Sequence, residues 1–292
     1  MGKINNIIFS DLDGTLLDHY TYQSTAASTT LQQLKHANIP VILNTSKTLA
    51  EIEIIKQEFG LDTPFIIENG AAIYIPIGTF TSQPIGTIVV DNYWVKSFCF
   101  SRQYWLNLLD KHSDEFAPYY QGFSTLSDSI LSTLTGLTLS EAKRAKKRQY
   151  GEPIQWLGDK ATKQAFIHHM LDLGANVVQG GRFLHIGGYC DKGQALLWLA
   201  EQYREFYIEK DQTTDKNTSL CTIALGDGEN DVPMLEAADI AVQIRSPVHE
   251  FPKLSRQYKT MQTTLFGPEG WTEAIQAILA NQLVSYSTDT LN

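Results

Sequence analysis

The strongest constraint on how this chain can fold is an apolar run that ends in two closely spaced aspartates. Residues 7–9 predict a buried strand, and Asp11 and Asp13 follow where that strand should end. Alternation along an extended chain places both carboxylates on one side. Because carboxylates this close repel each other, the pair favours a bound cation or a shared proton. An acidic β-turn through Gly14 is the alternative that this segment alone leaves open.

A second acidic cluster follows another apolar run far downstream. Residues 221–225 predict a buried strand, which runs into Gly-Asp-Gly-Glu-Asn-Asp at 226–231. Asp231 falls about one helical turn after Asp227 and on the same face. Carboxylate oxygens suit Mg²⁺ better than Zn²⁺, so the two clusters together predict a magnesium site. A helix capped by an acid would account for only part of these acids.

Two further motifs supply hydroxyl groups and cations. A strand-like run ends in Thr45, Ser46 and Lys47, just before an expected helix. A helix start binds anions, so phosphate binding and a plain N-cap are both open here. Lys192 stands at the start of an apolar helix, where its ammonium group supplies a point charge. The alternative for Lys192 is an ordinary surface lysine.

The two acidic motifs together resemble those of the haloacid dehalogenase superfamily of phosphohydrolases. This resemblance implies that Asp11 attacks phosphorus and forms an aspartyl-phosphate. It implies that Asp13 protonates the leaving oxygen and then activates water. The implied ligands of Mg²⁺ are Asp11, Asp13 through its backbone carbonyl, Asp227 and Asp231.

The same resemblance assigns roles to the hydroxyl and cation motifs. Thr45 matches the phosphate-binding Ser/Thr of the superfamily, with Ser46 close to it, and Lys192 matches the lysine that neutralises the transferring phosphoryl group. Many relatives carry Thr-Gly-Arg where this chain carries Thr-Ser-Lys, so Lys47 replaces an arginine. Thr45 and Lys192 are therefore catalytic candidates, together with Asp11 and Asp13.

The order of the expected elements predicts an α/β fold with a parallel, Rossmann-like sheet as its core. Strands and helices alternate in the first part of the chain and again after Lys192, as in parallel sheets covered by helices. The catalytic motifs follow strands at their carboxyl ends, where open α/β sheets bind ligands. The expected strands are 7–9, 41–43, 65–67, 220–225 and 240–242, and the expected helices are 24–37, 49–59, 231–238 and one that begins at 192.

About a hundred residues in the middle of the chain are more than this core needs. We expect the core to comprise residues 1–83 and 189–292, and residues 84–188 to form an inserted α/β cap that confers substrate specificity. Hinges are expected near 80–86 and 187–191. The expected cap elements are strands at 86–90, 175–178 and 182–186 and helices over 102–111, 139–149 and 161–173.

Polar residues of the cap and of nearby loops are candidates for substrate contact. Arg182 follows a glycine pair, and its guanidinium group can bind a carboxylate through two hydrogen bonds. His185 is as consistent with a structural role as with ligand binding. The candidate substrate-binding residues are Ser46, Lys47, Glu68, Asn69, Arg148, Glu152, Gly181, Arg182 and Asn230.

The segments around 45–48, 68–70, 148–153 and 180–183 resemble the mannosyl-3-phosphoglycerate phosphatase family, which carries Ser where this chain has Gly151. The resemblance implies Mg²⁺-dependent hydrolysis of mannosyl-3-phosphoglycerate to mannosylglycerate and phosphate. Three alternatives stay open. They are a phosphatase for another sugar phosphate such as sucrose phosphate, a phosphomannomutase-like phosphotransferase, and a non-catalytic sugar-phosphate sensor.

Composition excludes several other partners and sites. A formal charge of −9 argues against nucleic acid, and no apolar stretch approaches the length of a membrane span. Cys99, Cys190 and Cys221 lack metal-type spacing, so we expect reduced thiols and a cytoplasmic enzyme. We expect a small phosphorylated sugar as the partner, and a monomer or homodimer.

Overall fold

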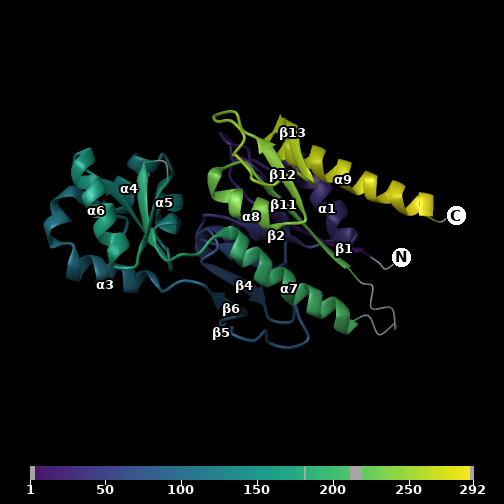
Figure 1. The fold of residues 1–292 in the computed structure, drawn as a ribbon, viewed down its shortest axis with the longest axis horizontal. Helices are drawn as coiled ribbons and strands as arrows, with labels where there is room; N and C mark the ends of the chain where they lie inside the picture. The colour runs from purple at the N-terminus through teal and green to yellow at the C-terminus, as the bar shows by residue number, and fades with distance from the viewer. Residues whose placement is uncertain (1–3, 181, 211–218, 290–292) are drawn as a thin grey trace.

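The computed structural model describes residues 4–180, 182–210 and 219–289 and divides them into two lobes (Figure 1). Each lobe is built on its own β-sheet. The larger lobe combines the beginning and the end of the chain, and the smaller lobe carries α3 to α6.

A nine-stranded sheet forms the centre of the larger lobe. The strands from β13 to β3 run parallel, and β4, β6 and β5 extend the sheet in antiparallel pairs. The α/β fold with a largely parallel core sheet is therefore confirmed. The order across the sheet is β13 (Thr260–Phe266), β12 (Ile240–Arg245), β11 (Ser219–Gly226), β1 (Ile4–Ser10), β2 (Val41–Asn44), β3 (Phe65–Ile67), β4 (Ala72–Pro76), β6 (Tyr93–Ser97) and β5 (Ile88–Val90).

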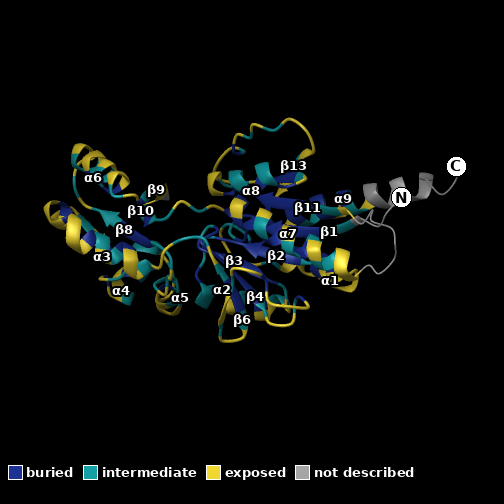
Figure 2. Cartoon of the chain, turned by 60° about the horizontal axis from the view of Figure 1, so that its bottom comes forward, coloured by how far each residue is buried: buried dark blue, intermediate teal, exposed yellow. Residues whose placement is uncertain are grey.

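Helices cover both faces of this sheet, because its central strands are apolar on both sides. On one face Ile8 packs in a cluster with Leu34 and Trp271; on the other, Phe9 packs with Leu196. Figure 2 shows the central strands as the most buried part of the lobe. The covering helices are η1 (Thr25–Ala27), α1 (Ser28–His36), α2 (Leu49–Phe59) and α9 (Gly267–Asp289) on the first face, and α7 (Lys192–Lys210) and α8 (Val232–Ala237) on the second, with the short η3 (Glu229–Asp231) leading into α8.

The smaller lobe has a four-stranded antiparallel sheet with its own core, in which Trp105, Phe166 and Ile186 are buried together. Its strands, in order across the sheet, are β7 (Tyr120–Gly122), β8 (Glu152–Trp156), β10 (Phe183–Gly187) and β9 (Asn176–Gly180). Its helices are α3 (Arg102–His112), η2 (Asp114–Tyr119), α4 (Asp128–Thr135), α5 (Leu139–Ala145) and α6 (Lys160–Asp172).

The first crossing between the lobes differs from the expected hinge near 80–86. The segment expected to begin the cap instead contains β5 and β6, which extend the larger sheet through pairing of β6 with β4. Trp94 and Val95 are buried in the larger lobe, which explains why this segment stays there. The chain therefore enters the smaller lobe after Ser97 and leaves it after Gly187.

The cysteine expectation is wrong for two of the three residues. Cys99 and Cys190 form a disulfide with their Cα atoms 6.3 Å apart, whereas Cys221 is a free thiol. The bonded residues lie on the two connections between the lobes, which the 91-residue separation in sequence does not reveal. The cytoplasmic location was inferred from reduced thiols, and a disulfide removes that argument. The location stays a prediction.

Within the described ranges, none of the helices combines the length and the apolar character that crossing a lipid bilayer requires.

Candidate active site

The carboxyl ends of three neighbouring parallel strands bring the sequence motifs together. In the register of the sheet, Ser10 of β1 lies beside Leu225 of β11 and Leu43 of β2. Asp11 follows directly, and its backbone amide donates to the carbonyl oxygen of Leu225 over 2.9 Å. Residues that are far apart in the sequence therefore meet at one edge of the sheet.

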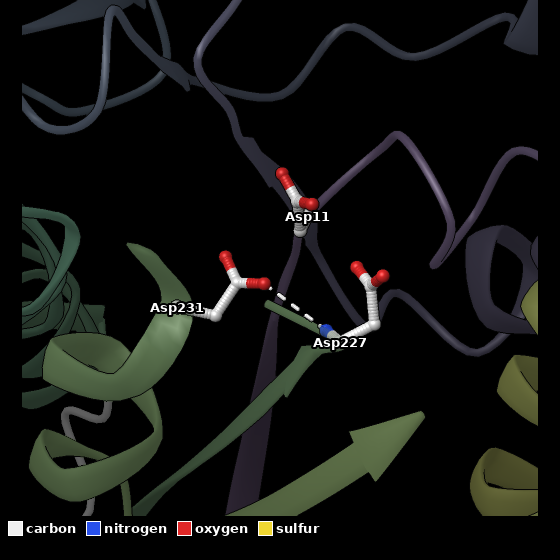
Figure 3. A group of neighbouring side chains, drawn as sticks. All are labelled: Asp11, Asp227 and Asp231. Carbon is white, nitrogen blue, oxygen red and sulfur yellow. Dashed lines mark hydrogen bonds between the residues drawn. The ribbon is translucent and has the colours of Figure 1, made fainter. Parts of the chain in front are cut away.

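Asp11, Asp227 and Asp231 form a buried carboxylate triad at this edge (Figure 3). One oxygen from each side chain lies within 4.8 Å of the others. Burial and the neighbouring charge of Asp231 raise the pKa of Asp11 to about 7. Burial and the charge of Asp11 raise the pKa of Asp227 to about 6. The charged form of these carboxylates is therefore less stable than in water, and an added cation would stabilise it.

Lys192 at the start of α7 supplies one buried positive charge to the triad. Its Nζ atom donates to Asp11 over 2.7 Å and to Asp231 over 2.6 Å, and its side chain is fully buried. Burial acts to lower the pKa of Lys192, but the charges of Asp11 and Asp231 outweigh it and raise that pKa. Lys192 is thus a fixed ammonium group beside the candidate nucleophile, and its role toward a phosphoryl group stays a prediction.

The two carboxylate oxygens of Asp231 bind different partners. Its Oδ2 accepts hydrogen bonds from the amides of Asp227 and Gly228 over 3.0 and 2.9 Å, while its Oδ1 accepts from Lys192. Both oxygens are therefore engaged by the protein. Asp231 fixes Lys192 and the 227–228 backbone, and this positioning role accompanies its place in the triad.

The donor set fits a magnesium ion. Asp11 and Asp227 contribute carboxylate oxygens, which Mg²⁺ prefers. Beside them, the Oδ1 atom of Asp13 is buried and has no hydrogen-bond partner among the described residues, which leaves the Asp13 carboxyl group available for its acid–base role. Gly14 allows the close approach, because a Cβ atom there would lie 2.6 Å from an oxygen of Asp227. Its φ of +79° also favours glycine.

The loop after β2 lies beside this triad. Lys47 Nζ lies 2.7 Å from Asp13 Oδ2, and Thr45 is fully buried with its hydroxyl accepting from the Lys47 amide over 3.2 Å. Burial acts to lower the pKa of Lys47, but the charge of Asp13 outweighs it and raises that pKa. The structure therefore joins Lys47 to the candidate acid–base residue.

A cleft of about 730 Å³ opens next to this site and is lined by both lobes. Burial and the charge of Arg148 lower the pKa of His185 to about 4, so the imidazole in the cleft is neutral near pH 7. The larger lobe contributes Ser46, Glu68, Asn69, Asp191, Gly228 and Asn230, and the smaller lobe contributes Arg148, Tyr150 and His185.

Three of the predicted substrate-binding residues that the structure describes do not line this cleft: Glu152, Arg182 and Lys47, of which Lys47 contacts Asp13. Glu152 is fully buried in the smaller lobe, where Arg102 forms an ion pair with it and Ser124 donates two hydrogen bonds to it. It lines a separate cavity of about 460 Å³. Arg182 is exposed in the turn between β9 and β10 and does not line the cleft. Gly181 lies outside the described residues.

Glu68 is inside the cleft, but its carboxylate is already engaged by the protein. It accepts hydrogen bonds from three backbone amides of the smaller lobe and forms an ion pair with Arg148. Asn69 and Asn230 are joined by a side-chain hydrogen bond of 3.2 Å at the rim. The predicted residues Ser46, Asn69, Arg148 and Asn230 are thus brought together, and Glu68 holds the two lobes against each other.

Sequence reasoning missed one histidine at this site and left the role of a second one open. His249, in the loop after β12, places Nε2 3.4 Å from Asp227, and its segment carries no recognisable motif. His185 was noted, but only its alternation with buried Leu184 and Ile186 along β10 could have shown that it faces the cleft.

Comparison with known proteins agrees with this geometry. Residues 8–89 match the family of haloacid dehalogenase-like hydrolases. A glucosyl-3-phosphoglycerate/mannosyl-3-phosphoglycerate phosphatase of Methanococcoides burtonii is 36% identical over 276 residues, covering 94% of this chain and 98% of the relative. A phosphatase of the same description from Persephonella marina is 32% identical, covering 94% and 97%.

Solved structures share the fold at lower identity. A Thermoplasma acidophilum protein aligns with a TM-score of 0.63 and 16% identity, covering 94% of this chain and 98% of that one. The sucrose-phosphatase of Synechocystis, solved with sucrose and phosphate, aligns with a TM-score of 0.53 and 14% identity over 94% and 98%. The whole-length similarity to the first two relatives is decisive: the chain belongs to the haloacid dehalogenase-like hydrolase family, in which it is a phosphatase.

Proposed function

We propose that this phosphatase hydrolyses a hexosyl-3-phosphoglycerate, either the mannosyl or the glucosyl compound, to hexosylglycerate and phosphate. One observation carries the proposal: the Asp11–Lys192 pair lies next to a two-lobed cleft of about 730 Å³, a volume in the range of small-molecule sites. The names of the two relatives supply the substrate class.

Asp11 is the proposed nucleophile. Lys192 binds its Oδ1, and among the described residues its Oδ2 has no hydrogen-bond donor, so Oδ2 is the oxygen that attacks phosphorus. The bond from phosphorus to the glycerate oxygen breaks as the aspartyl-phosphate forms. Asp13, in its protonated form, gives its proton to that leaving oxygen.

The same two residues complete the second step. Asp13 takes a proton from a water molecule, whose oxygen attacks the phosphorus of the aspartyl-phosphate. The bond between phosphorus and Asp11 breaks, which releases phosphate and restores both carboxyl groups. Lys192 and Thr45 are proposed to hold the phosphoryl oxygens during both steps. Lys47, which contacts Asp13, adds a second positive charge.

Magnesium completes the proposed site. Asp11, Asp227 and the Asp13 carbonyl would hold the ion, which supplies positive charge that stabilises the phosphoryl oxygens. Asp231 would support it by fixing Lys192 and the Asp227 amide.

The smaller lobe is proposed to act as the cap that selects the sugar and excludes water. The sheet topology favours a cap that begins after Ser97 and ends at Gly187, in place of the expected limits at 84 and 188. Neutral groups suit sugar hydroxyls, so we propose Asn69, Asn230 and His185 as sugar contacts. Ser46 and Arg148 are proposed to face the charged end of the substrate.

Phosphate release from a panel of substrates tests the proposal. We expect hydrolysis of mannosyl- or glucosyl-3-phosphoglycerate to exceed that of sucrose 6-phosphate and mannose 6-phosphate in kcat/KM. Preference for sucrose 6-phosphate would replace the substrate assignment. Retention of the phosphoryl group on a sugar product would indicate a phosphotransferase, and saturable binding without turnover would indicate a sensor.

A further inference from the structure

Glu68 belongs to the larger lobe, yet the partners of its carboxylate among the described residues all belong to the smaller lobe. The side chain is 2% exposed. Its Oε1 accepts a hydrogen bond from the amide of Gln149 over 2.6 Å, and its Oε2 accepts from the amides of Tyr150 and Gly151 over 3.2 Å each. The Nε atom of Arg148 lies 3.4 Å from Oε2. This buried anion therefore holds a whole segment of the smaller lobe through its charge.

The backbone around Glu68 is joined to the loop that carries Thr45 and Lys47. The Glu68 amide donates to the Lys47 carbonyl over 3.0 Å, and the Asn69 amide donates to the Thr45 carbonyl over 2.9 Å. Glu68 and Asn69 have φ angles of +48° and +59°. Asparagine adopts this left-handed region readily, whereas glutamate adopts it rarely, so the conformation of Glu68 depends on the contacts around it. The turn and the loop are thus one hydrogen-bonded unit.

The same turn also fits against the start of α7. A Cβ atom on Gly70 would lie 2.0 Å from the carbonyl oxygen of Asp191, so the turn packs directly on the residue before Lys192. Lys47, from the loop, contacts Asp13 over 2.7 Å. A shift of the turn would therefore displace both cations that surround the candidate nucleophile and acid.

We propose that Glu68 is a positioning residue that couples docking of the smaller lobe to assembly of the phosphoryl-binding loop. The amides of 149–151 and Arg148 hold the Glu68 carboxylate in place. The carboxylate holds its turn in the left-handed conformation, and the turn sets the position of Thr45 and Lys47. The inference rests on the proposed roles of those two residues and gives Glu68 no contact with substrate.

Glu152 provides a matched control. It is also a buried glutamate with an arginine partner and two further hydrogen bonds, but all its partners lie within the smaller lobe. Glu68→Gln and Glu152→Gln each remove one buried negative charge. In Glu68→Gln the amide NH₂ group must face a donor of the smaller lobe, because both carboxylate oxygens accept there.

The test compares hydrolysis of p-nitrophenyl phosphate, which has no sugar to contact the cap, with amide hydrogen exchange. We expect Glu68→Gln to lower kcat by about tenfold or more and to speed exchange of the Glu68 and Asn69 amides. Glu152→Gln should change kcat by less than about twofold and leave those amides protected. Arg148→Gln should reproduce the faster amide exchange of Glu68→Gln, and in the double variant this exchange should be little faster than in either single variant.

Several results would overturn the inference. Equal falls in kcat for Glu68→Gln and Glu152→Gln would show general loosening, and a rise in KM for the hexosyl substrate alone would make Glu68 a substrate contact. If Glu68→Gln changed neither kcat nor amide exchange, Glu68 would not couple docking of the smaller lobe to the phosphoryl-binding loop. If Glu68→Gln does not fold, Glu68→Asp, whose shorter side chain cannot reach the same amides, decides by the same measurements, since the kcat of Arg148→Gln also reflects the contact of Arg148 with Ser46 and its proposed contact with substrate. If the wild-type protein hydrolyses no phosphoester, the proposed function fails, while the exchange comparison still decides whether Glu68 orders the loop.

Discussion

The two lobes use their buried charges in different ways. In the larger lobe, Asp11 and Asp227 share a site where one cation, Lys192, meets several carboxylates, and burial raises the pKa of both. In the smaller lobe, Glu152 is matched by Arg102 and by Ser124. The first arrangement leaves negative charge that a ligand can use, and the second leaves none. A buried charged group is therefore a candidate for catalysis or ligand binding when no partner within the protein neutralises its charge.

The first prediction tests the unsatisfied site in the larger lobe. Asp11→Asn should lower kcat/KM by at least about a thousandfold, because a carboxamide is a poor nucleophile of nearly the same shape. The control Asp62→Asn, at an exposed position, should leave activity unchanged. Phosphate release measures both. Substantial activity in Asp11→Asn, in a preparation shown by mass spectrometry to be free of deamidation, would contradict the nucleophile assignment.

Metal removal tests the same site without changing its residues. Chelation with EDTA should reduce turnover to below about 1%, and added Mg²⁺ should restore it. Asp227→Ala should raise the Mg²⁺ concentration needed for half-maximal activity, since it removes one ligand. Full activity after exhaustive chelation would mean that Lys192 and Lys47 alone neutralise the phosphoryl group.

The disulfide tests how firmly the two lobes are tied together. Replacing Cys99 and Cys190 by alanine should lower the free energy of unfolding by roughly 2–4 kcal/mol, because the bond closes a long loop in the unfolded chain. Cys221→Ala, which removes the free thiol, is the matched control. Urea unfolding with and without reductant measures the difference. A wild-type protein whose stability ignores reductant would show that the two thiols stay unbonded in solution.

Proton competition gives a smaller effect in the larger lobe. The pKa of Asp11 is raised to about 7 in the metal-free site, so this carboxyl group holds a proton below that pH. Mg²⁺ needs the carboxylate, and the apparent affinity should fall by about fivefold as the pH drops from 7 to 6, because the ionised fraction of Asp11 falls by that factor. Calorimetry at pH 7 in buffers of different ionisation enthalpy should show proton release on binding. No release would mean that Asp11 is already ionised.

The sequence predicted the larger lobe better than the smaller one, for physical reasons. Asp11, Asp227 and Thr45 each follow a buried strand, so local pattern and sheet geometry together place them. Glu68 and Glu152 look alike in sequence. Only tertiary contacts show that one joins the lobes and the other stabilises the smaller lobe. A strand at 86–90 was predicted but assigned to the cap, because the local pattern of a strand does not show which sheet it joins, and only the pairing of β6 with β4 places β5 and β6 in the large sheet.

Arg182 tests whether the smaller lobe also carries a charge that pairs with the substrate. Its sequence context predicted a carboxylate contact, but the structure leaves it exposed in the β9–β10 turn and outside the cleft. We therefore expect Arg182→Ala to lower kcat/KM for the hexosyl substrate by less than about threefold, since an exposed arginine without a ligand contributes little. The cleft residue Arg148 provides the contrast, and Arg148→Ala should cost more on every substrate. A loss of tenfold or more for Arg182→Ala on the hexosyl substrate alone, with p-nitrophenyl phosphate unaffected, would show that this turn swings into the cleft during turnover. The positive charge of Arg182 would then be neutralised by the substrate. The smaller lobe would, like the larger one, carry a charge for the substrate to pair with, and the two lobes would differ only in the substrate-free protein.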